Sequence, residues 1–573
     1  MTEERGRLRI LWLMAAAALL AAVLVARLAY WQVAQHDHIV ALAAEQHEVT
    51  VKLPADRGSI LDRNHQLLAG DIPVYDVVAA PNLITVARRQ PTAQALAPIL
   101  GRSEADILKD LGRPLKFEYL KRKLPKESAD KVDALHLSGI ALQQDSARSY
   151  LLSDPGQGGQ DARSMAGNLL GFVNDAGQGQ YGLEQYYDAL LHGTDGVEAT
   201  LKTGASETIH LSDKKRVEPR KGDDLVLGLD SQIQFFAEKA LQDGVKKTKS
   251  ESGTVLVMEP STGNIVAWAD YPTYDANHFA ATDAKLFTDP AVSGLYEPGS
   301  LMKVVTLSGS MDAGAITPDY TFNETGSVSV GGYTIHDWDL KPHGVINMTR
   351  VLELSLNAGA VKAMQLEGPD NFYRYFQGFG IGHKTGLDVA NEVNQPLPAL
   401  SAIHASEMAT MSFGQGVAVT PVEMISALNT IANGGRTVQP RAVIQRRRSD
   451  GQVIDVPVTL GQQVVTPATA AKMRDMMISV TEKGSGKPAR IDGWAGRIAG
   501  KTGTANIPEN GKYSDKVIAS FAGFMPADHP RFTMLVIMRK PQGSNFEQEG
   551  TFAAAPVWKQ IAQQILVQWQ MTP

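Results

Sequence analysis

The stretch Lys501-Thr502-Gly503-Thr504 decides how this 573-residue chain is interpreted, because two other motifs precede it in a fixed order. The first is Ser300-Leu301-Met302-Lys303, in which a lysine follows a serine by three positions. The second, between the other two, is Ser355-Leu356-Asn357. Each pattern alone is common by chance, but S-x-x-K, S-x-N and K-T-G in this order are typical of a serine-nucleophile active site.

The S-x-x-K motif predicts an activated serine. Pro298 and Gly299 are poor residues for a helix interior, whereas residues 300–312 have helical character, so Ser300 is expected at a helix N-terminus. Lys303 then lies one turn later on the same face. The helix dipole and burial both disfavour an ammonium there, which predicts a neutral amine that can accept the serine proton. Taken alone, a capping serine and a surface lysine would be the simpler explanation.

The S-x-N motif predicts two polar groups beside that serine. It ends an apolar helical stretch over residues 348–354. The Ser355 hydroxyl can pass a proton to a leaving group, and the Asn357 amide can bind a substrate carbonyl. In isolation, an ordinary helix C-terminus would explain these residues equally well.

The K-T-G motif occurs twice, and only one copy is expected to be functional. The copy at Lys384 follows a glycine-rich turn, whereas the copy at Lys501 precedes a pair of apolar strands. At the edge of a sheet, Lys501 and Thr502 can bind a carboxylate or an amide, and Gly503 lets the backbone approach closely. We therefore take Lys501 as the functional copy. The site would be completed by an oxyanion hole made of the backbone N–H groups of Ser300 and Thr504.

Composition narrows the class of protein. The chain is 43% hydrophobic and 20% charged with a net charge of −6, which is typical of a globular protein and not of a nucleic-acid binder. It contains no cysteine, and its 13 histidines show no zinc-ligand spacing. We therefore expect no nucleic acid, no metal and no cofactor.

An apolar run over residues 10–33 predicts a transmembrane helix, since a bilayer is crossed by roughly 20 residues. The pair Tyr30-Trp31 lies where an interfacial aromatic belt would be. Large residues continue beyond the small ones, which favours an uncleaved anchor over a signal peptide. Three arginines precede the run, so the positive-inside rule places residues 1–9 in the cytoplasm and the rest of the chain outside.

Two domains are expected beyond the anchor, over residues 34–222 and 223–573. The predicted fold class is α+β: a single N-terminal transmembrane helix, an elongated α+β pedestal, and a domain with a central antiparallel sheet flanked by helices. In the pedestal, residues 93–111 and 128–135 have helical spacing, and residues 154–163 have loop composition. In the second domain the expected sheet strands are residues 254–258, 265–269, 519–525 and 532–538.

These motifs resemble those of class B penicillin-binding proteins, the monofunctional peptidoglycan D,D-transpeptidases. Residues 297–303 match E-P-G-S-x-x-K, and residues 57–63 resemble the R-G-x-I-x-D-R segment that opens the pedestal of that family. Residues 412–416, followed by Thr420-Pro421, resemble the S-F-G-Q-G…T-P stretch that is commoner in the cell-division group, the FtsI type. Leu301 and Leu356 depart from the residues usual in the family, as does His65, where glycine is common.

The resemblance implies a peptidoglycan crosslinking enzyme of the cytoplasmic (inner) membrane. Ser300 would be acylated by the D-Ala-D-Ala end of a stem peptide on lipid II-derived glycan strands, with Lys303 as base and Ser355 as proton relay. β-Lactams would acylate the same serine. The donor peptide would be held by Asn357, Lys501, Thr502, Gly503 and Thr504. The implied partners are an FtsW-like polytopic glycosyltransferase of the SEDS group (shape, elongation, division and sporulation) and other division proteins.

Three other functions share parts of this pattern. A β-lactamase needs a group that activates water, such as the E-x-x-L-N stretch of class A enzymes, and none lies between the second and third motifs. A β-lactam sensor or an inactive scaffold is the second, although one anchor and a nine-residue tail leave little to signal with. An elongation-type class B transpeptidase is the third alternative.

Overall fold

The computed structural model describes residues 2–38, 48–154, 162–201, 215–509, 511–544 and 548–572. Residues 155–161, which belong to the loop predicted at 154–163, lie outside the described residues. The chain forms two compact units: residues 1–56 with 193–221, and residues 57–192 with 222–573.

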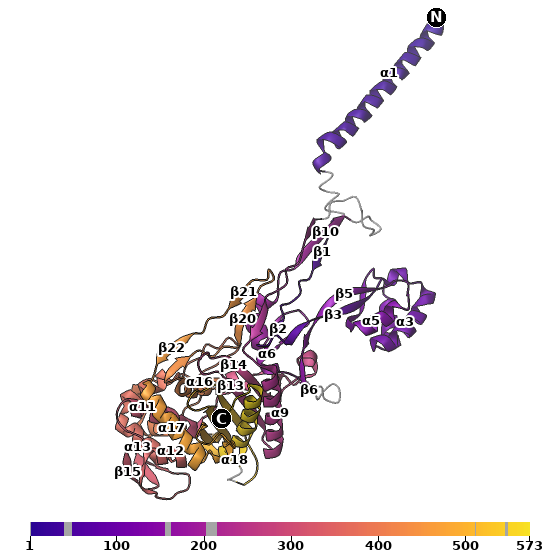
Figure 1. Ribbon diagram of the computed structural model, residues 1–573. Coiled ribbons are helices and arrows are strands. Elements are labelled where there is room, and N and C mark those ends of the chain that lie inside the picture. Colours follow the sequence, from indigo (N-terminus) through magenta and orange to yellow (C-terminus); the bar gives the residue numbers. More distant parts are fainter. Residues whose placement is uncertain are drawn as a thin grey trace. The chain divides into compact units, whose positions relative to one another are not determined.

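The first unit contains one long apolar helix. This is α1 (Thr2–Ala29; Figure 1), which continues into a π-helical turn, η1 (Tyr30–Ala34). The span Arg7–Ala34 has 28 residues, and an 18-residue window within it has a mean hydropathy of 2.4, so it is long and apolar enough to cross a membrane. The predicted N-terminal apolar helix is thus confirmed. The same unit has an antiparallel sheet of β1 (Glu48–Leu53), β10 (Gly196–Leu201) and β11 (Lys215–Val217).

The second unit contains a seven-stranded sheet of order β21-β20-β12-β2-β3-β4, in which β5 also pairs with β3; β20 and β21 come from a later part of the chain than the other strands. These strands are β2 (Ile60–Leu61), β3 (Leu67–Ala79), β4 (Glu118–Pro125), β5 (Ile140–Tyr150), β12 (Asp224–Leu227), β20 (Val443–Arg447) and β21 (Val453–Asp455). Shorter elements follow β5: β6 (Leu152–Asp154), β7 (Arg163–Ser164), α6 (Gly167–Leu170), β8 (Phe172–Val173), β9 (Gly179–Gln180), α7 (Gly182–Tyr186) and α8 (Asp188–Leu191).

Three helices pack with β3 and β4 around a small separate core, after the 3-10 turn η2 (Pro81–Leu83). They are α3 (Val86–Leu100), α4 (Glu104–Leu111) and α5 (Lys126–Asp133). The helical stretch predicted over residues 93–111 is therefore interrupted. Gly101 ends α3 in the left-handed region at φ 63°, and Ser103 caps α4 by accepting a hydrogen bond from the Asp106 N–H. The helical spacing of apolar residues runs across Gly101 without a gap, because α3 and α4 both bury apolar side chains in the same core.

A buried ionic cluster holds the segment at residues 57–63 in place. The Glu184 carboxylate, which is fully buried, lies 2.7 Å from the Arg57 Nε and 2.8 Å from the Arg148 Nε. The Tyr150 hydroxyl also donates to it. At the other end of the segment, Arg63 pairs with Glu259 at 2.7 Å. Arg57 and Arg63 thus both form ion pairs with other residues of the second unit.

Replacing Glu184 by alanine is expected to destabilise the second unit by about 3–5 kcal/mol, because it leaves two buried guanidinium groups without their shared carboxylate. Thermal unfolding of the full chain in detergent would measure this as a clear fall in Tm. Asp475→Ala is the control, since Asp475 pairs with Arg474 at 2.9 Å but is 65% exposed, and its loss should cost less than about 1 kcal/mol. Equal Tm values for the two variants would contradict this prediction.

The central sheet of the second unit has the order β14-β13-β25-β24-β23, and every pairing in it is antiparallel. Its strands are β13 (Ser252–Met258), β14 (Ile265–Tyr271), β23 (Ala499–Glu509), β24 (Lys512–Met525) and β25 (Phe532–Arg539). The first two strands come from the start of the domain and the last three from its end. This confirms the antiparallel sheet predicted from the sequence.

Both faces of this sheet are buried, and alternate residues face opposite sides. On one face Val255 and Val257 pack with α9 (Ser231–Thr248) and α19 (Ala555–Gln568), whose Trp558 is fully buried. On the other face Leu256 and Met258 join the main core. A four-residue helix, α18 (Gly550–Ala553), precedes α19.

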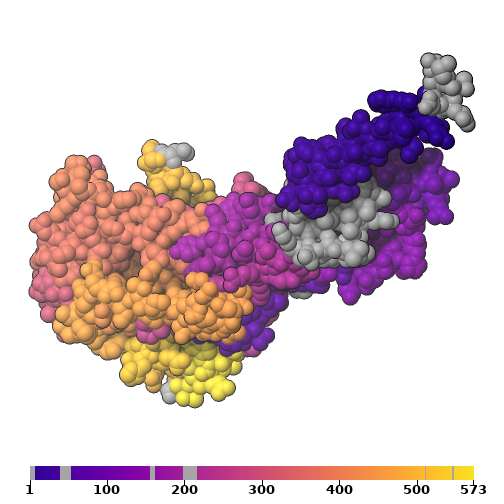
Figure 2. Space-filling model, turned by 90° about the horizontal axis from the view of Figure 1, so that it is seen from above, coloured from indigo at the N-terminus to yellow at the C-terminus, as the bar shows by residue number. Residues whose placement is uncertain are grey.

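The segment between β14 and β23 supplies the helices that cover the second face. In the space-filling view its salmon and orange residues form one continuous mass (Figure 2). Its helices are α10 (Pro290–Ser293), α11 (Met302–Asp312), α12 (Met348–Leu354), α13 (Asn357–Glu367), α14 (Pro369–Gly378), α15 (Ala405–Met411), α16 (Pro421–Ala432) and α17 (Pro467–Lys483). Its short strands are β15 (Thr321–Glu324), β16 (Ser327–Val330), β17 (Tyr333–His336), β18 (Gly344–Asn347), β19 (Arg436–Val438) and β22 (Leu460–Gln463). Its 3-10 turns are η3 (Ala276–Ala281), η4 (Ala284–Phe287), η5 (Gly299–Leu301), η6 (Leu400–Ala402) and η7 (Lys487–Ala489).

Candidate active site

Ser300 lies in the 3-10 turn η5, immediately before α11 begins at Met302. The sequence placed it in the first turn of the helix itself, so the structure moves the helix start by two residues. Lys303 is in the first turn of α11 and is fully buried. Its Nζ lies 3.0 Å from the Ser300 Oγ, which is hydrogen-bonding distance.

Ser355 and Asn357 occupy the junction between two helices. Ser355 ends α12 in a left-handed conformation at φ 61°, and Asn357 is the first residue of α13. The Lys303 Nζ donates to the Asn357 Oδ1 at 2.9 Å and to the Ser355 carbonyl at 2.6 Å, and it lies 3.4 Å from the Ser355 Oγ. The turn therefore fixes the Lys303 amine by hydrogen bonds, and its own residues Ser355 and Asn357 line the cavity described below.

Lys501 lies on β23, the edge strand of the central sheet, and is fully buried. Its Nζ donates to the Ser355 Oγ at 2.8 Å and to the Thr502 carbonyl at 2.8 Å. The Thr502 hydroxyl in turn lies 2.7 Å from the Ser485 hydroxyl. Hydrogen-bonding distances thus link the three motifs through Ser300, Lys303, Ser355 and Lys501.

Glycines allow β23 and the turn that carries Ser300 to lie against each other. A Cβ at Gly503 would lie 2.3 Å from the Ser520 Oγ and 3.0 Å from the Pro298 carbonyl, so only glycine fits there. A Cβ at Gly299, which has φ +54°, would lie 2.6 Å from the Thr504 carbonyl. Ser300 and Thr504, predicted to form the oxyanion hole, are brought together in this way.

The second K-T-G run lies elsewhere. Lys384 belongs to a segment without helix or strand, between α14 and η6. The Thr385 N–H and hydroxyl both donate to the Glu392 carboxylate. Lys384 lines a different cavity, beside Glu423 and Gln439.

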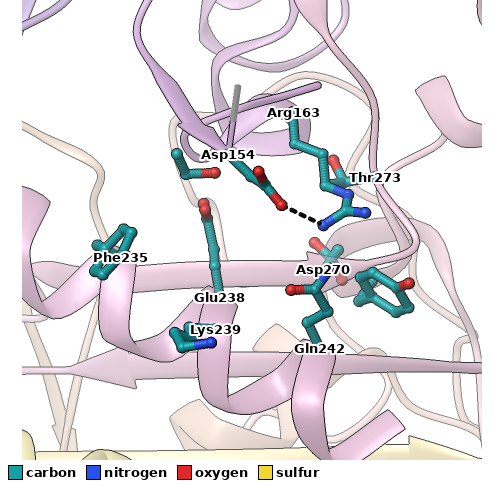
Figure 3. A pocket seen from close by; sticks show the side chains of 10 residues that line it. Asp154, Arg163, Phe235, Glu238, Lys239, Gln242, Asp270 and Thr273 are labelled. Carbon is teal, nitrogen blue, oxygen red and sulfur yellow. Dashed lines mark hydrogen bonds and ion pairs between the residues drawn. The ribbon is translucent and has the colours of Figure 1, made fainter. Parts of the chain in front are cut away.

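A cavity of about 280 Å³ opens over the linked residues. Its lining includes the predicted Ser300, Ser355, Asn357, Thr502 and Thr504, together with Trp338, Phe413, Gln415, Ser485, Asn506, Glu549 and Thr551. Another cavity, shown in Figure 3, lies between α9, β14 and β6–β7, and none of the predicted site residues lines it. Among the described residues, no group of three or more His, Cys, Asp or Glu side chains is arranged to hold a metal.

The electrostatics of the site favour an uncharged lysine beside the serine. Burial lowers the pKa of Lys303 from 10.5 to about 7, and the negative charge of Asp337 only partly opposes this shift. Burial also lowers the pKa of Lys501 well below 10.5, and the positive charge of Lys303 lowers it further. At neutral pH the Lys303 amine is therefore available as a proton acceptor.

Sequence reasoning missed several lining residues and the contacts of Glu297. The sequence marks Glu297 only as the first residue of E-P-G-S. Its carboxylate accepts hydrogen bonds from the Gly416 N–H at 3.0 Å and the Tyr513 hydroxyl at 3.1 Å, so it joins the nucleophile turn to two other segments. Trp338 and Ser485 come from loops without a recognisable motif, whereas Phe413 and Gln415 had a signal, in S-F-G-Q-G.

The departures from the family pattern do not alter the lining of the cavity. Leu301 and Leu356 are both fully buried in the main core, and neither side chain lines the cavity over Ser300. His65 has φ 62°, a left-handed conformation that glycine adopts freely, which explains why glycine suits this position.

Comparison with family models gives two matches. Residues 253–563 match the penicillin-binding protein transpeptidase domain, and residues 52–227 match the penicillin-binding protein dimerisation domain.

Similar proteins cover nearly the whole chain. Stage V sporulation protein D of Bacillus subtilis is 29% identical over 99% of this chain and 86% of its own length. The peptidoglycan D,D-transpeptidase FtsI of Escherichia coli is 28% identical over 96% of this chain and 90% of its own length. Among solved structures, penicillin-binding protein 3 of Mycobacterium tuberculosis complexed with ampicillin has a TM-score of 0.69 and 26% identity, covering 91% of this chain and 97% of the other.

Proposed function

Because this chain belongs to the penicillin-binding protein transpeptidase family, we propose that it crosslinks peptidoglycan stem peptides through an acyl-enzyme on Ser300. The observation that carries the proposal is the chain of contacts from the Ser300 Oγ through Lys303 and Ser355 to Lys501. Such a chain gives a serine a proton acceptor and gives the leaving group a proton donor.

In the first half-reaction, the Ser300 Oγ attacks the carbonyl carbon of the D-Ala-D-Ala bond while the neutral Lys303 amine takes its proton. The backbone N–H groups of Ser300 and Thr504 stabilise the oxyanion, a contribution typically worth about 3 kcal/mol for each donor. Collapse of the intermediate breaks the C–N bond. Ser355, which is hydrogen-bonded to Lys501, passes its proton to the departing D-alanine amine and takes back the proton held by Lys303, whose amine becomes neutral again.

In the second half-reaction, an amine of a neighbouring stem peptide attacks the ester carbonyl, and its proton passes through Lys303 to the Ser300 Oγ as the ester C–O bond breaks. Lys501 and Thr502 hold the carboxylate end of the donor peptide during acylation, and the Asn357 amide holds its backbone. The low pKa of Lys501 implies that a bound carboxylate would restore its charged form. Lys501 would therefore become positively charged when the carboxylate end of the substrate binds, and would form an ion pair with it.

The test is the intact mass of the full chain in detergent after penicillin treatment. We expect a stable increase of one penicillin, and sequencing of the modified peptide should place it on Ser300. A rapidly lost adduct with turnover of the antibiotic would instead support a β-lactamase. No adduct at all would overturn the proposal.

We further propose that the protein acts in septal wall synthesis, anchored by α1 with its N-terminus in the cytoplasm. The S-F-G-Q-G stretch and the similarity to FtsI support the division role, and the implied membrane partner is an FtsW-like glycosyltransferase. Depletion in the cell of origin tests this role. Filamentous cells are expected, whereas round cells would indicate an elongation transpeptidase and unchanged growth an inactive scaffold.

The two K-T-G lysines offer a matched comparison. Lys501→Met should reduce acylation by a D-Ala-D-Ala donor about 100-fold or more, because the variant loses a charge-assisted contact to the substrate carboxylate and the hydrogen bond to Ser355. Lys384→Met should leave the rate constant within twofold of the wild type. Second-order acylation rate constants measure both effects, and a larger loss for Lys384→Met would show that the functional copy was assigned wrongly.

A further inference from the structure

Glu549 is one of the residues that line the cavity over Ser300. It is the only acidic residue among the described residues that line this cavity. It follows β25 in the sequence and immediately precedes the short helix α18, so it is outside all three catalytic motifs. The crosslinking reaction outlined above gives it no role.

The position of Glu549 is fixed by its neighbour. The Gly550 N–H donates to the Thr504 Oγ1 at 3.2 Å, which ties this segment to β23 directly after the K-T-G motif. A Cβ at Gly550 would lie 2.4 Å from the Gly503 carbonyl and 2.2 Å from the Ser520 carbonyl. Because the backbone of Gly550 packs this closely against β23 and β24, the backbone position of the adjacent Glu549 is fixed.

No described residue forms an ion pair or a side-chain hydrogen bond with the Glu549 carboxylate, although it is partly buried. It is the N-cap residue of α18, but its side chain accepts no capping hydrogen bond. Other carboxylates of the same domain are paired: Glu509 binds Lys516 at 2.9 Å, and Glu297 accepts from Tyr513. Burial raises the pKa of Glu549, with no compensating cation among its described neighbours. A partly desolvated carboxylate without a partner gains stability when a cation binds beside it.

Resting on the proposed function, we propose that Glu549 binds a primary ammonium group of a peptidoglycan stem peptide in the active-site cleft. The cleft then has two recognition points: the K-T-G strand, with Thr502 in the lining and Lys501 buried beside it, for the carboxylate end of the donor, and Glu549 for a cationic substituent. A buried lysine behind one part of the cavity and a carboxylate in its lining favour one orientation of a peptide and disfavour the reverse. Glu549 is thus a specificity-determining residue for stem peptides that carry a free amine.

The ammonium can come from the side chain of the donor stem or from the incoming acceptor, and two measurements distinguish these sources. The first compares acylation by two thiolester donors, one with a free side-chain amine and one with that amine acetylated. The second measures how the acyl-enzyme divides between hydrolysis and attack by an amine acceptor, as a function of acceptor concentration. Both use the full chain in detergent, as wild type, Glu549→Gln and Glu509→Gln.

If the donor supplies the ammonium, the wild type should prefer the free-amine donor about tenfold, and Glu549→Gln should lose that preference through KM with kcat little changed. If the acceptor supplies it, Glu549→Gln should need about tenfold more acceptor for half-maximal aminolysis. In either case the effect should shrink at high salt. Glu509→Gln removes an equal charge from the far end of β23 and should behave as the wild type.

The inference is overturned if Glu549→Gln matches the wild type in both measurements, or if it lowers acylation by both donors equally. Stoichiometric labelling by penicillin shows that each variant is folded. Penicillin labelling also distinguishes failure of the proposed acyl-enzyme from failure of the proposed role of Glu549. A wild-type protein that forms no penicillin adduct contradicts the acyl-enzyme itself, whereas an active wild type with an unaltered Glu549→Gln contradicts only the role of Glu549.

Discussion

Ser300→Ala is expected to abolish the penicillin adduct and to reduce transpeptidation by roughly 10³-fold or more. Without the Oγ no ester can form at position 300, and the Ser355 hydroxyl in the same cavity is engaged by Lys501 at 2.8 Å. Stability should change little, because the Ser300 side chain makes one described hydrogen bond, to Lys303. Intact mass and a donor-substrate assay measure the two effects.

Ser426→Ala is the control for this variant. It removes a hydroxyl from α16, where the Ser426 Oγ donates to the Val422 carbonyl, and it should retain full labelling. A covalent adduct on Ser300→Ala, at any residue and at the wild-type rate, would show that the nucleophile has been assigned wrongly.

Lys303→Met is expected to slow acylation roughly 10³-fold while leaving substrate binding largely intact, because it removes the proton acceptor and keeps the volume of the buried side chain. The pH profile gives an independent readout. Since burial holds the pKa of Lys303 at about 7, its neutral form is lost as the pH falls below that value. The wild-type rate constant should therefore fall about tenfold for each pH unit below about 7 and level off above it.

The variant should lose this inflection, because the group that titrates is gone. Acylation rate constants from pH 5 to 9 provide the test, with Lys384→Met as the control that keeps the wild-type profile. A wild-type rate that decreases as the pH rises through 7 would mean that the protonated lysine is the active form. The role of Lys303 as base would then be wrong.

The sheet was predictable because its strands are short apolar runs with turn residues at their ends. Residues 254–258 and 265–269 flank a turn rich in Pro, Gly and Asn, and a second pair ends the domain, so an antiparallel sheet closed by the termini follows from pattern alone. Periodicity could not locate the break at Gly101, nor the start of α11 two residues after Ser300, since both depend on local backbone geometry.

The sequence predicted those residues of the site that belong to the three motifs, and not the others that line the cavity. S-x-x-K, S-x-N and K-T-G predicted residues that lie within hydrogen-bonding distance of one another. The amide of Asn357 also holds Lys303, which no spacing indicates. Glu549 and Ser485 lie far along the chain from Ser300 and reach the cavity only through the fold. Contacts of this kind depend on tertiary packing, which a single sequence does not reveal.

The groups around Ser300 come from stretches of chain more than 50 residues apart, at the start of α11, the end of α12 and the edge strand β23. None of these stretches holds the reactive arrangement by itself, so partly folded molecules should stay unlabelled. A fluorescent penicillin would then serve as an active-site titrant, reporting the native fraction of any preparation, mutant or refolding reaction.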